Sequence, residues 1–102
     1  LTHVSLYTTI GRTYEGEGQL ELAESYFTRV VSLLEQADDP YALARAQTNL
    51  AALLIKMRTH GREHAAADAR QLLTAAETTQ TRLGDQVGLM TTRHNRSILH
   101  NA

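Results

Sequence analysis

The stretch that decides the fold covers residues 7–27 and reads YTTIGRTYEGEGQLELAESYF. Its apolar and aromatic residues recur every three or four positions, which predicts a helix, and its glycines at 16 and 18 predict a break before a second helix. Gly11 and Ala23 are small, whereas Tyr14 and Phe27 are large. Because small residues let helices approach and large ones fill the remaining space, this pattern predicts two closely packed antiparallel helices.

Outward from this stretch, punctuation and periodicity predict five helices, at about 2–15, 19–37, 40–58, 62–83 and 86–100. Asp39 and Asp85 are suited to cap the helices that follow them, Pro40 fits a first helical position, and Gly84 fits the position just after a helix. The expected inward-facing residues are Leu6, Tyr7, Ile10, Tyr14, Ala23, Tyr26, Phe27, Val30, Leu34, Ala37, Leu43, Ala46, Leu50, Leu53, Leu54, Met57, Ala65, Ala69, Leu72, Leu73 and Ala76. Alternating apolar runs are missing, so the expected fold class is all-α.

The motif Tyr7-x-x-Ile10-Gly11-x-x-Tyr14, followed by Ala23-x-x-x-Phe27, resembles the signature of the tetratricopeptide repeat. The resemblance implies antiparallel helix pairs stacked as a right-handed α-α superhelix. It places repeat one at about 4–37, repeat two at about 40–84, and a partial repeat or capping helix at about 86–101.

The later repeats follow the motif more loosely. The offsets from Thr9 to Asn49 and from Asn49 to Asn95 are 40 and 46 residues. Those spacings resemble the longer repeats of bacterial regulatory proteins. In the last helix, Arg96 falls at a position expected to be buried, and a two-residue shift that places Ile98 there is the alternative.

In this family the first helix of each pair lines a concave face that holds a protein or peptide segment. The resemblance assigns that role to Thr8, Thr9, Arg12, Arg45, Thr48, Asn49, Ala52, Lys56, His94 and Asn95, with Ile55 and Thr91 beside them. Asn49 can offer a donor and an acceptor to an extended backbone. Thr8 and Thr91 stand where a carboxylate clamp needs basic residues, so an acidic segment bound more loosely near Arg12, Arg45 and Lys56 remains open.

Composition excludes several other classes of protein. The 102 residues suit one domain, and the absence of cysteine excludes disulfides and thiolate metal sites. No apolar run approaches the roughly 20 residues of a membrane span and no secretory signal is evident, so the cytoplasm is the expected location. The chain starts at Leu1 within an apolar pattern, and we interpret it as a segment of a longer protein.

Charge is distributed unevenly along the chain. Residues 1–39 carry two basic and seven acidic side chains, whereas residues 40–102 carry eight basic and four acidic ones. Chance scatter over solvated faces explains this asymmetry, and end-to-end polarity that favours head-to-tail contacts is the alternative. The densest basic cluster, Arg58, Arg62 and Arg70, lacks aromatic platforms, so nucleic-acid binding is not expected.

No catalytic, cofactor or metal motif stands in a convincing context, and the His60/His64 pair lacks an evident third ligand. Three hypotheses therefore follow. The first is a non-enzymatic peptide-binding module of a larger bacterial regulatory or signalling protein. The second is a structural solenoid segment or self-association module, and the third is an unrelated helical bundle with an enzymatic or small-molecule site.

Overall fold

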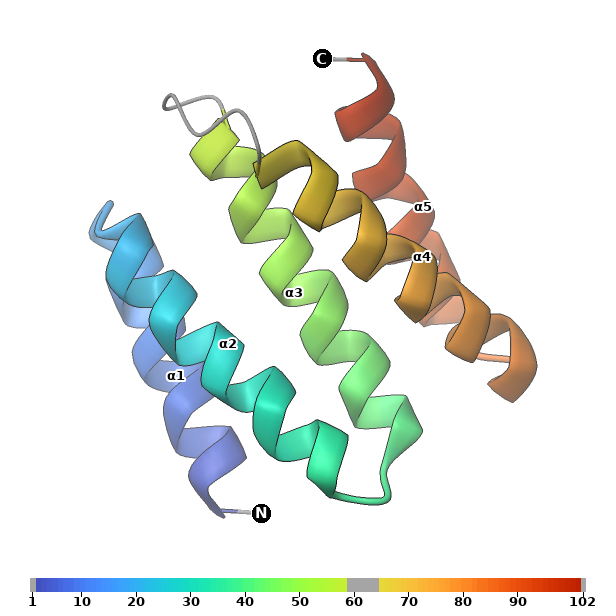
Figure 1. The fold of residues 1–102 in the computed structure, drawn as a ribbon, viewed down its shortest axis with the longest axis horizontal. Coiled ribbons are helices and arrows are strands. Elements are labelled where there is room, and N and C mark those ends of the chain that lie inside the picture. The colour runs from blue at the N-terminus through green and yellow to red at the C-terminus, as the bar shows by residue number, and fades with distance from the viewer. Residues whose placement is uncertain (1, 59–64, 102) are drawn as a thin grey trace.

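A computed structural model describes residues 2–58 and 65–101 of the chain. Its described residues form five α-helices and no strand: α1 (Thr2–Gly16), α2 (Leu20–Gln36), α3 (Pro40–Arg58), α4 (Ala65–Leu83) and α5 (Gln86–Asn101) (Figure 1). The expected all-α fold of about five helices is confirmed. The prediction that the fourth helix begins at residue 62 falls on 59–64, outside the described residues.

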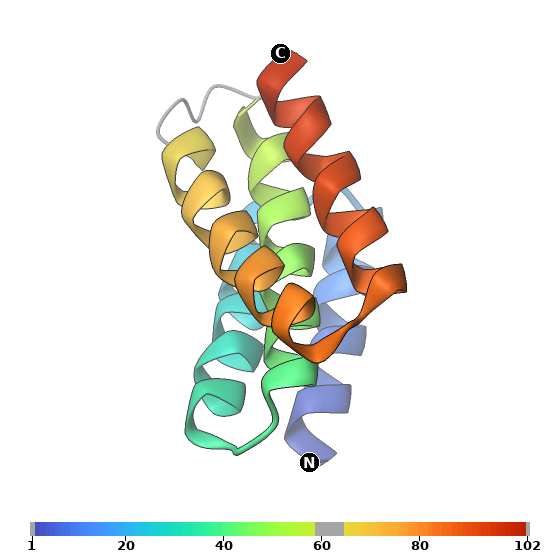
Figure 2. The same ribbon diagram turned by 90° about the vertical axis from the view of Figure 1, so that its right-hand side faces the viewer.

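Each helix runs antiparallel to the one before it, so α1, α3 and α5 point the same way (Figure 1). Turned by 90°, α2 and α4 lie on one side, α1 and α5 on the other, and α3 between them (Figure 2). The molecule measures 34 × 32 × 19 Å, and its shortest dimension equals about two helix diameters. Two layers of helices account for this thickness, while stacking as a right-handed superhelix stays a prediction.

Glycine ends two of the helices by adopting a left-handed conformation. Gly18 has φ +80° and Gly84 has φ +70°. In both turns the next amide donates to the carbonyl oxygen five residues earlier, at 2.9 Å. This double turn satisfies helix carbonyls that would otherwise lack a partner, and residues with a Cβ adopt its positive φ at a cost.

Aspartate caps the helices that follow two of the turns, as the sequence predicts. One carboxylate oxygen of Asp39 accepts the backbone N–H three residues on at 3.1 Å, and Asp85 does the same at 3.0 Å. Because the first amides of a helix have no partner within it, these two side chains fix the starts of α3 and α5.

Close packing of α1 on α2 depends on Gly11. A Cβ atom at this position would lie 2.6 Å from Cε1 of Phe27, well inside van der Waals contact. Ala23, also on α2, is completely buried. The small-against-large pairing expected for Gly11 and Phe27 is therefore confirmed.

The tyrosines assigned to the core reach it only in part. Tyr7, Tyr14 and Tyr26 are half-buried, and the ring of Tyr26 lies 5.7 Å from Tyr7 and 5.8 Å from Tyr14. The Arg29 guanidinium lies over the Tyr26 ring at 5.5 Å and covers one face of it. Leu6 was expected in the core but is 50% exposed, so that expectation is wrong.

The central position of α3 changes which of its residues are buried. α3 contacts α2, α4 and α5, so it has no single inward stripe. Thr48 and Ile55, expected on the concave face, are only 4% and 6% exposed, so each presents little surface to a ligand. The buried residues of α3 are Ala44, Ala46, Thr48, Leu50, Ala51, Leu53, Leu54, Ile55 and Met57.

The inward face of α5 is formed by Leu89, Thr92 and Leu99, which are buried. The alternative register with Ile98 inside is wrong, because Ile98 is 42% exposed. Arg96 does occupy an inward position and is half-buried. Its charge is accommodated by an acidic residue on α4, so a basic residue is tolerated there.

Candidate binding groove

A groove with an apolar floor runs between α1 and α3. We call it the α1–α3 groove, and its volume is about 300 Å³. Phe27, Val30 and Leu34 of α2 line it from below. Its walls are Val4, Thr8 and Arg12 of α1, and Tyr41, Ala42, Arg45, Ala46 and Asn49 of α3. This size lies at the lower end of ligand pockets, which suits one apolar side chain with its flanking backbone.

Three polar residues of the groove wall have little or no bonding within the protein. Arg12 is exposed and makes no ion pair within the described part of the chain. Arg45 faces Tyr41, with its guanidinium carbon 5.8 Å from the ring centroid and Nη1 donating to the Tyr41 hydroxyl at 3.4 Å. The side-chain amide of Asn49 makes no hydrogen bond to any described residue. These groups are available to an external ligand.

A smaller hollow continues the groove toward α5. This α3–α5 hollow has a volume of about 80 Å³ and shares Tyr41, Arg45 and Asn49 with the groove. Its other lining residues are Thr48, Gln80, Asp85, Val87, Gly88 and Thr91. The two cavities therefore form one continuous surface across the three helices that run in the same direction.

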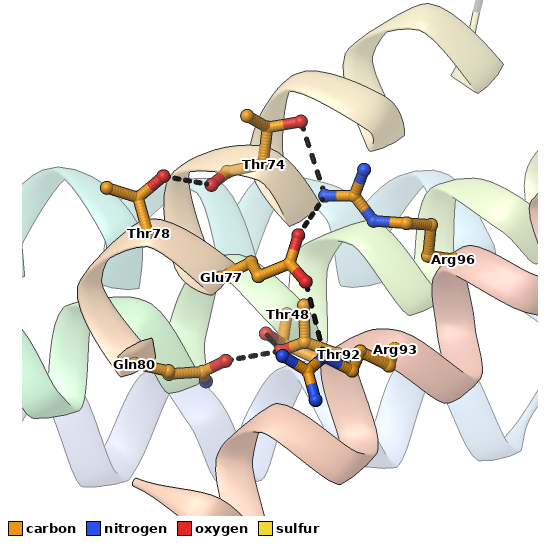
Figure 3. Close-up of polar contacts among 8 residues, drawn as sticks. All are labelled: Thr48, Thr74, Glu77, Thr78, Gln80, Thr92, Arg93 and Arg96. Atoms are coloured by element: carbon orange, nitrogen blue, oxygen red, sulfur yellow. Dashed lines mark hydrogen bonds and ion pairs between the residues drawn. The ribbon is translucent and has the colours of Figure 1, made fainter. Parts of the chain in front are cut away.

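Beneath the hollow lies a buried chain of polar side chains from three helices (Figure 3). The Thr92 hydroxyl of α5 donates to Oε1 of Gln80 on α4 at 2.6 Å, and Oγ1 of Thr48 on α3 lies 3.0 Å from Oγ1 of Thr92. Oγ1 of Thr48 also lies 3.1 Å from the carbonyl oxygen of Ala44 in its own helix. A hydroxyl has one proton, so with Thr92 donating to Gln80, the proton of Thr48 serves either Ala44 or Thr92. These contacts link α5 to both α3 and α4.

Gly88 is required by the geometry at the start of α5. A Cβ atom there would lie 2.2 Å from Oδ2 of Asp85 and 2.8 Å from Nε2 of Gln80. The capping carboxylate and the buried amide therefore face each other across the space that a side chain would occupy. Oδ2 of Asp85 is buried and accepts no hydrogen bond in the part of the chain that the structure describes.

Ion pairs join α4 and α5 on the outside of this junction. Glu77 lies 3.0 Å from Nη2 of Arg96 and 3.3 Å from Nε of Arg93, and Arg96 also donates to Thr74 at 3.4 Å (Figure 3). One carboxylate thus pairs with two guanidinium groups on successive turns of α5. Both partners are partly solvated, so the pairs orient the helices more than they stabilise them.

The structure brings together only part of the predicted site. Of the ten predicted residues, those that line the groove or the hollow are Thr8, Arg12, Arg45, Thr48 and Asn49. Thr9, Ala52, Lys56, His94 and Asn95 do not line either cavity. The assignment to a site remains a prediction for all ten.

Several of these residues are engaged within the protein. Lys56 forms an ion pair with Glu15 across α1 and α3, and Asn95 donates to the carbonyl oxygen of Thr91 in its own helix at 3.1 Å. The Thr8 hydroxyl donates to the carbonyl oxygen of Val4 at 2.7 Å. Lys56 and Asn95 are therefore less available to a ligand than Asn49.

Sequence reasoning missed Gln80, Asp85 and Gly88 as lining residues of the hollow. The available signal was Gln80, a polar residue that continues the apolar stripe into the last turn of the fourth helix, eight residues before Gly88. No three His, Cys, Asp or Glu side chains gather as a metal-binding group within residues 2–58 and 65–101. Over the same ranges, none of the helices combines the length and the apolarity that crossing a membrane needs.

Comparison of the chain with protein-family models, curated proteins and solved structures finds no match. The tetratricopeptide resemblance thus rests on the motif and on the packing of Gly11 against Phe27. It remains a prediction.

Proposed function

We propose that this chain is a non-enzymatic module that binds an extended segment of another protein along the α1–α3 groove. The observation that carries the proposal is Asn49, whose amide lines both cavities and makes no hydrogen bond within the described residues. A side-chain amide can pair with the N–H and C=O of an extended backbone without regard to its sequence. The tetratricopeptide-like motif supports a place in a larger bacterial regulatory or signalling protein of the cytoplasm.

The dimensions of the groove support a short extended segment. Its walls span residues 4–12 and 41–49, two stretches of equal length that run in the same direction. At about 1.5 Å per helical residue, each wall is about 12 Å long. An extended chain advances about 3.3 Å per residue, so the groove accommodates about four residues.

The test is a screen of the chain against a peptide library, with binding mapped by NMR amide shifts and measured by fluorescence anisotropy. Asn49→Ala should weaken binding about fivefold or more, because one net hydrogen bond contributes about 1 kcal/mol. Its melting temperature should hardly change, since no internal bond is lost.

The matched control is Asn95→Ala, which removes the same amide from outside both cavities. If Asn49→Ala and Asn95→Ala bind the peptide with equal affinity, the role assigned to Asn49 is contradicted. A library whose ligands shift resonances only outside the groove would contradict the proposed function itself.

Self-association is the second candidate, favoured by the outer face of α5. Val87 and Met90 are 76% and 74% exposed, and Ile98 lies on the same face by helical spacing. α5 has no acidic residue, whereas exposed Leu22 of α2 is flanked by Glu21. A second copy could therefore dock head to tail, with α5 against α2.

Sedimentation across a concentration range tests this second candidate. Met90→Glu should then dissociate a salt-sensitive oligomer, while Arg82→Gln, a charge change on α4, should not. A monomer at every concentration would exclude the second candidate.

A further inference from the structure

Resting on the proposed function, we infer that the segment bound in the α1–α3 groove is acidic and carries an apolar side chain between its carboxylates. In the described part of the chain, the walls and floor of the groove include two arginines and no acidic residue. Among the described residues that line the two cavities, Asp85 is the only one with a carboxylate, and it belongs to the hollow at the α5 end. Charge complementarity therefore selects carboxylates for the α1–α3 part of the surface.

The two arginines are positioned for carboxylates at different points along the groove. Arg12 is the last lining residue of the α1 wall, and Arg45 precedes Asn49, the last lining residue of the α3 wall, by about one helical turn. One turn is about 5.4 Å. Residues i and i+2 of an extended chain lie about 6.6 Å apart and share a face. The proposed ligand therefore has carboxylates at positions i and i+2, one for each arginine, on either side of one apolar residue.

The floor determines what lies between the carboxylates. Phe27, Val30 and Leu34 are buried in the isolated protein, with exposures of 4%, 3% and 2%. They still contribute apolar surface to a groove of about 300 Å³. A volume of this size admits one apolar side chain rather than a row of them. The ligand is thus of the form acid–apolar–acid.

Tyr41 acts as the positioning residue for Arg45. Its ring lies under the guanidinium, and its hydroxyl accepts from Nη1. An unsupported arginine loses side-chain freedom when it binds a carboxylate, whereas one already held on a ring loses less. No described residue supports Arg12 in this way, so Arg45 is the stronger of the two contacts.

The probes are three fluorescein-labelled octapeptide pools with Gly on either side of Glu-Φ-Glu, Gln-Φ-Gln or Lys-Φ-Lys, where Φ is Leu, Ile or Phe. At 50 mM salt the acidic pool should bind about fivefold tighter than the amide pool, the limit for solvent-exposed pairs. The difference should shrink as salt rises to 300 mM, since surface charges are screened.

Single-residue variants test which side chains cause the preference for the acidic pool over the amide pool. Arg45→Gln should remove most of the difference between the acidic and amide pools, and Arg12→Gln should remove less. Tyr41→Ala should reduce the discrimination, whereas Tyr41→Phe should retain most of it because the ring remains. Arg82→Gln, the same change at an exposed arginine outside both cavities, should have no effect.

The outcomes separate this inference from the proposed function. Groove binding with equal affinity for the acidic and amide pools would overturn the inference and leave the proposed function intact. Tighter binding of the basic pool would likewise overturn the inference and leave the proposed function intact. If no pool shifts the amide resonances of the groove residues, the inference and the proposed function both fail.

Discussion

Replacing Gly11 by alanine should destabilise the protein, although glycine-to-alanine changes within helices usually do the opposite. Alanine gains about 1 kcal/mol over glycine in a helix interior. At this position, however, the new Cβ would lie 2.6 Å from Cε1 and 2.8 Å from Cδ1 of Phe27. Carbon atoms in contact prefer about 3.5–4.0 Å, so the ring or the helix must move by about 1 Å.

The loss of stability expected for Gly11→Ala depends on how far Phe27 can move. Phe27 is 4% exposed and packed in the core, so its ring cannot move aside into solvent. Overpacking of a filled core costs about 1–3 kcal/mol, which exceeds the gain in helix propensity. We therefore expect a net loss of about 1 kcal/mol, which lowers the melting temperature of a domain this size by about 4–8 °C.

Thermal and urea unfolding followed by circular dichroism provide the assay, and Gly16→Ala is the matched control. Gly16 ends the same helix, and a Cβ atom there meets nothing within 4 Å. This control should be neutral or slightly stabilising. In a Phe27→Leu background, Gly11→Ala should cost less, because the ring that it strikes is absent. If Gly11→Ala stabilises the protein as Gly16→Ala does, the close packing of α1 on α2 is refuted.

Three further changes probe the α3–α4–α5 junction. Thr92→Val should lower the unfolding free energy in urea by about 1–3 kcal/mol, since it leaves the buried Gln80 oxygen without a donor, whereas Thr92→Ser should largely preserve it. Gly88→Ala should cost about 1 kcal/mol in the same assay by displacing the Asp85 cap, with stabilisation as the contrary result. Glu77→Gln should cost at most about 1 kcal/mol and should become neutral in 1 M salt, which thermal unfolding at two salt concentrations would check.

The helices could be predicted from the sequence because their ends depend on local chemistry. Gly18 and Gly84 adopt φ values that favour glycine, and Asp39 and Asp85 bond to amides only three residues away. Such interactions are encoded within four or five neighbouring positions. For this reason the predicted boundaries agree with the structure to within one or two residues wherever the structure describes them.

Burial on α3 could not be predicted in the same way. Periodicity assigns one inward face to a helix, but α3 is enclosed by α2, α4 and α5. The family resemblance assigned Thr48 to the concave face, yet Thr48 is 4% exposed and lies against Thr92 of α5. Its partner Thr92 is 44 residues away, and no local signal joins the two. Sequence periodicity alone therefore does not predict which polar residues pair between helices.

Phe27 links the packing of the fold to the chemistry of the groove. The same ring touches the position of Gly11 on one side and forms part of the groove floor on the other. The size of residue 27 should therefore set the size of the apolar side chain that the groove accepts. Phe27→Leu enlarges the floor and should shift the preferred central residue of Glu-Φ-Glu peptides from Leu toward Phe or Trp.

Competition anisotropy with the single peptides checks this shift, at a temperature where the variant is folded. Loss of volume at a buried site costs stability but leaves the walls, with Arg12, Arg45 and Asn49, in place. The acidic preference should consequently persist while the apolar preference changes. An unchanged order of central residues would mean that the apolar side chain does not rest on Phe27. The ligand would then contact the arginines from above the groove instead of entering it.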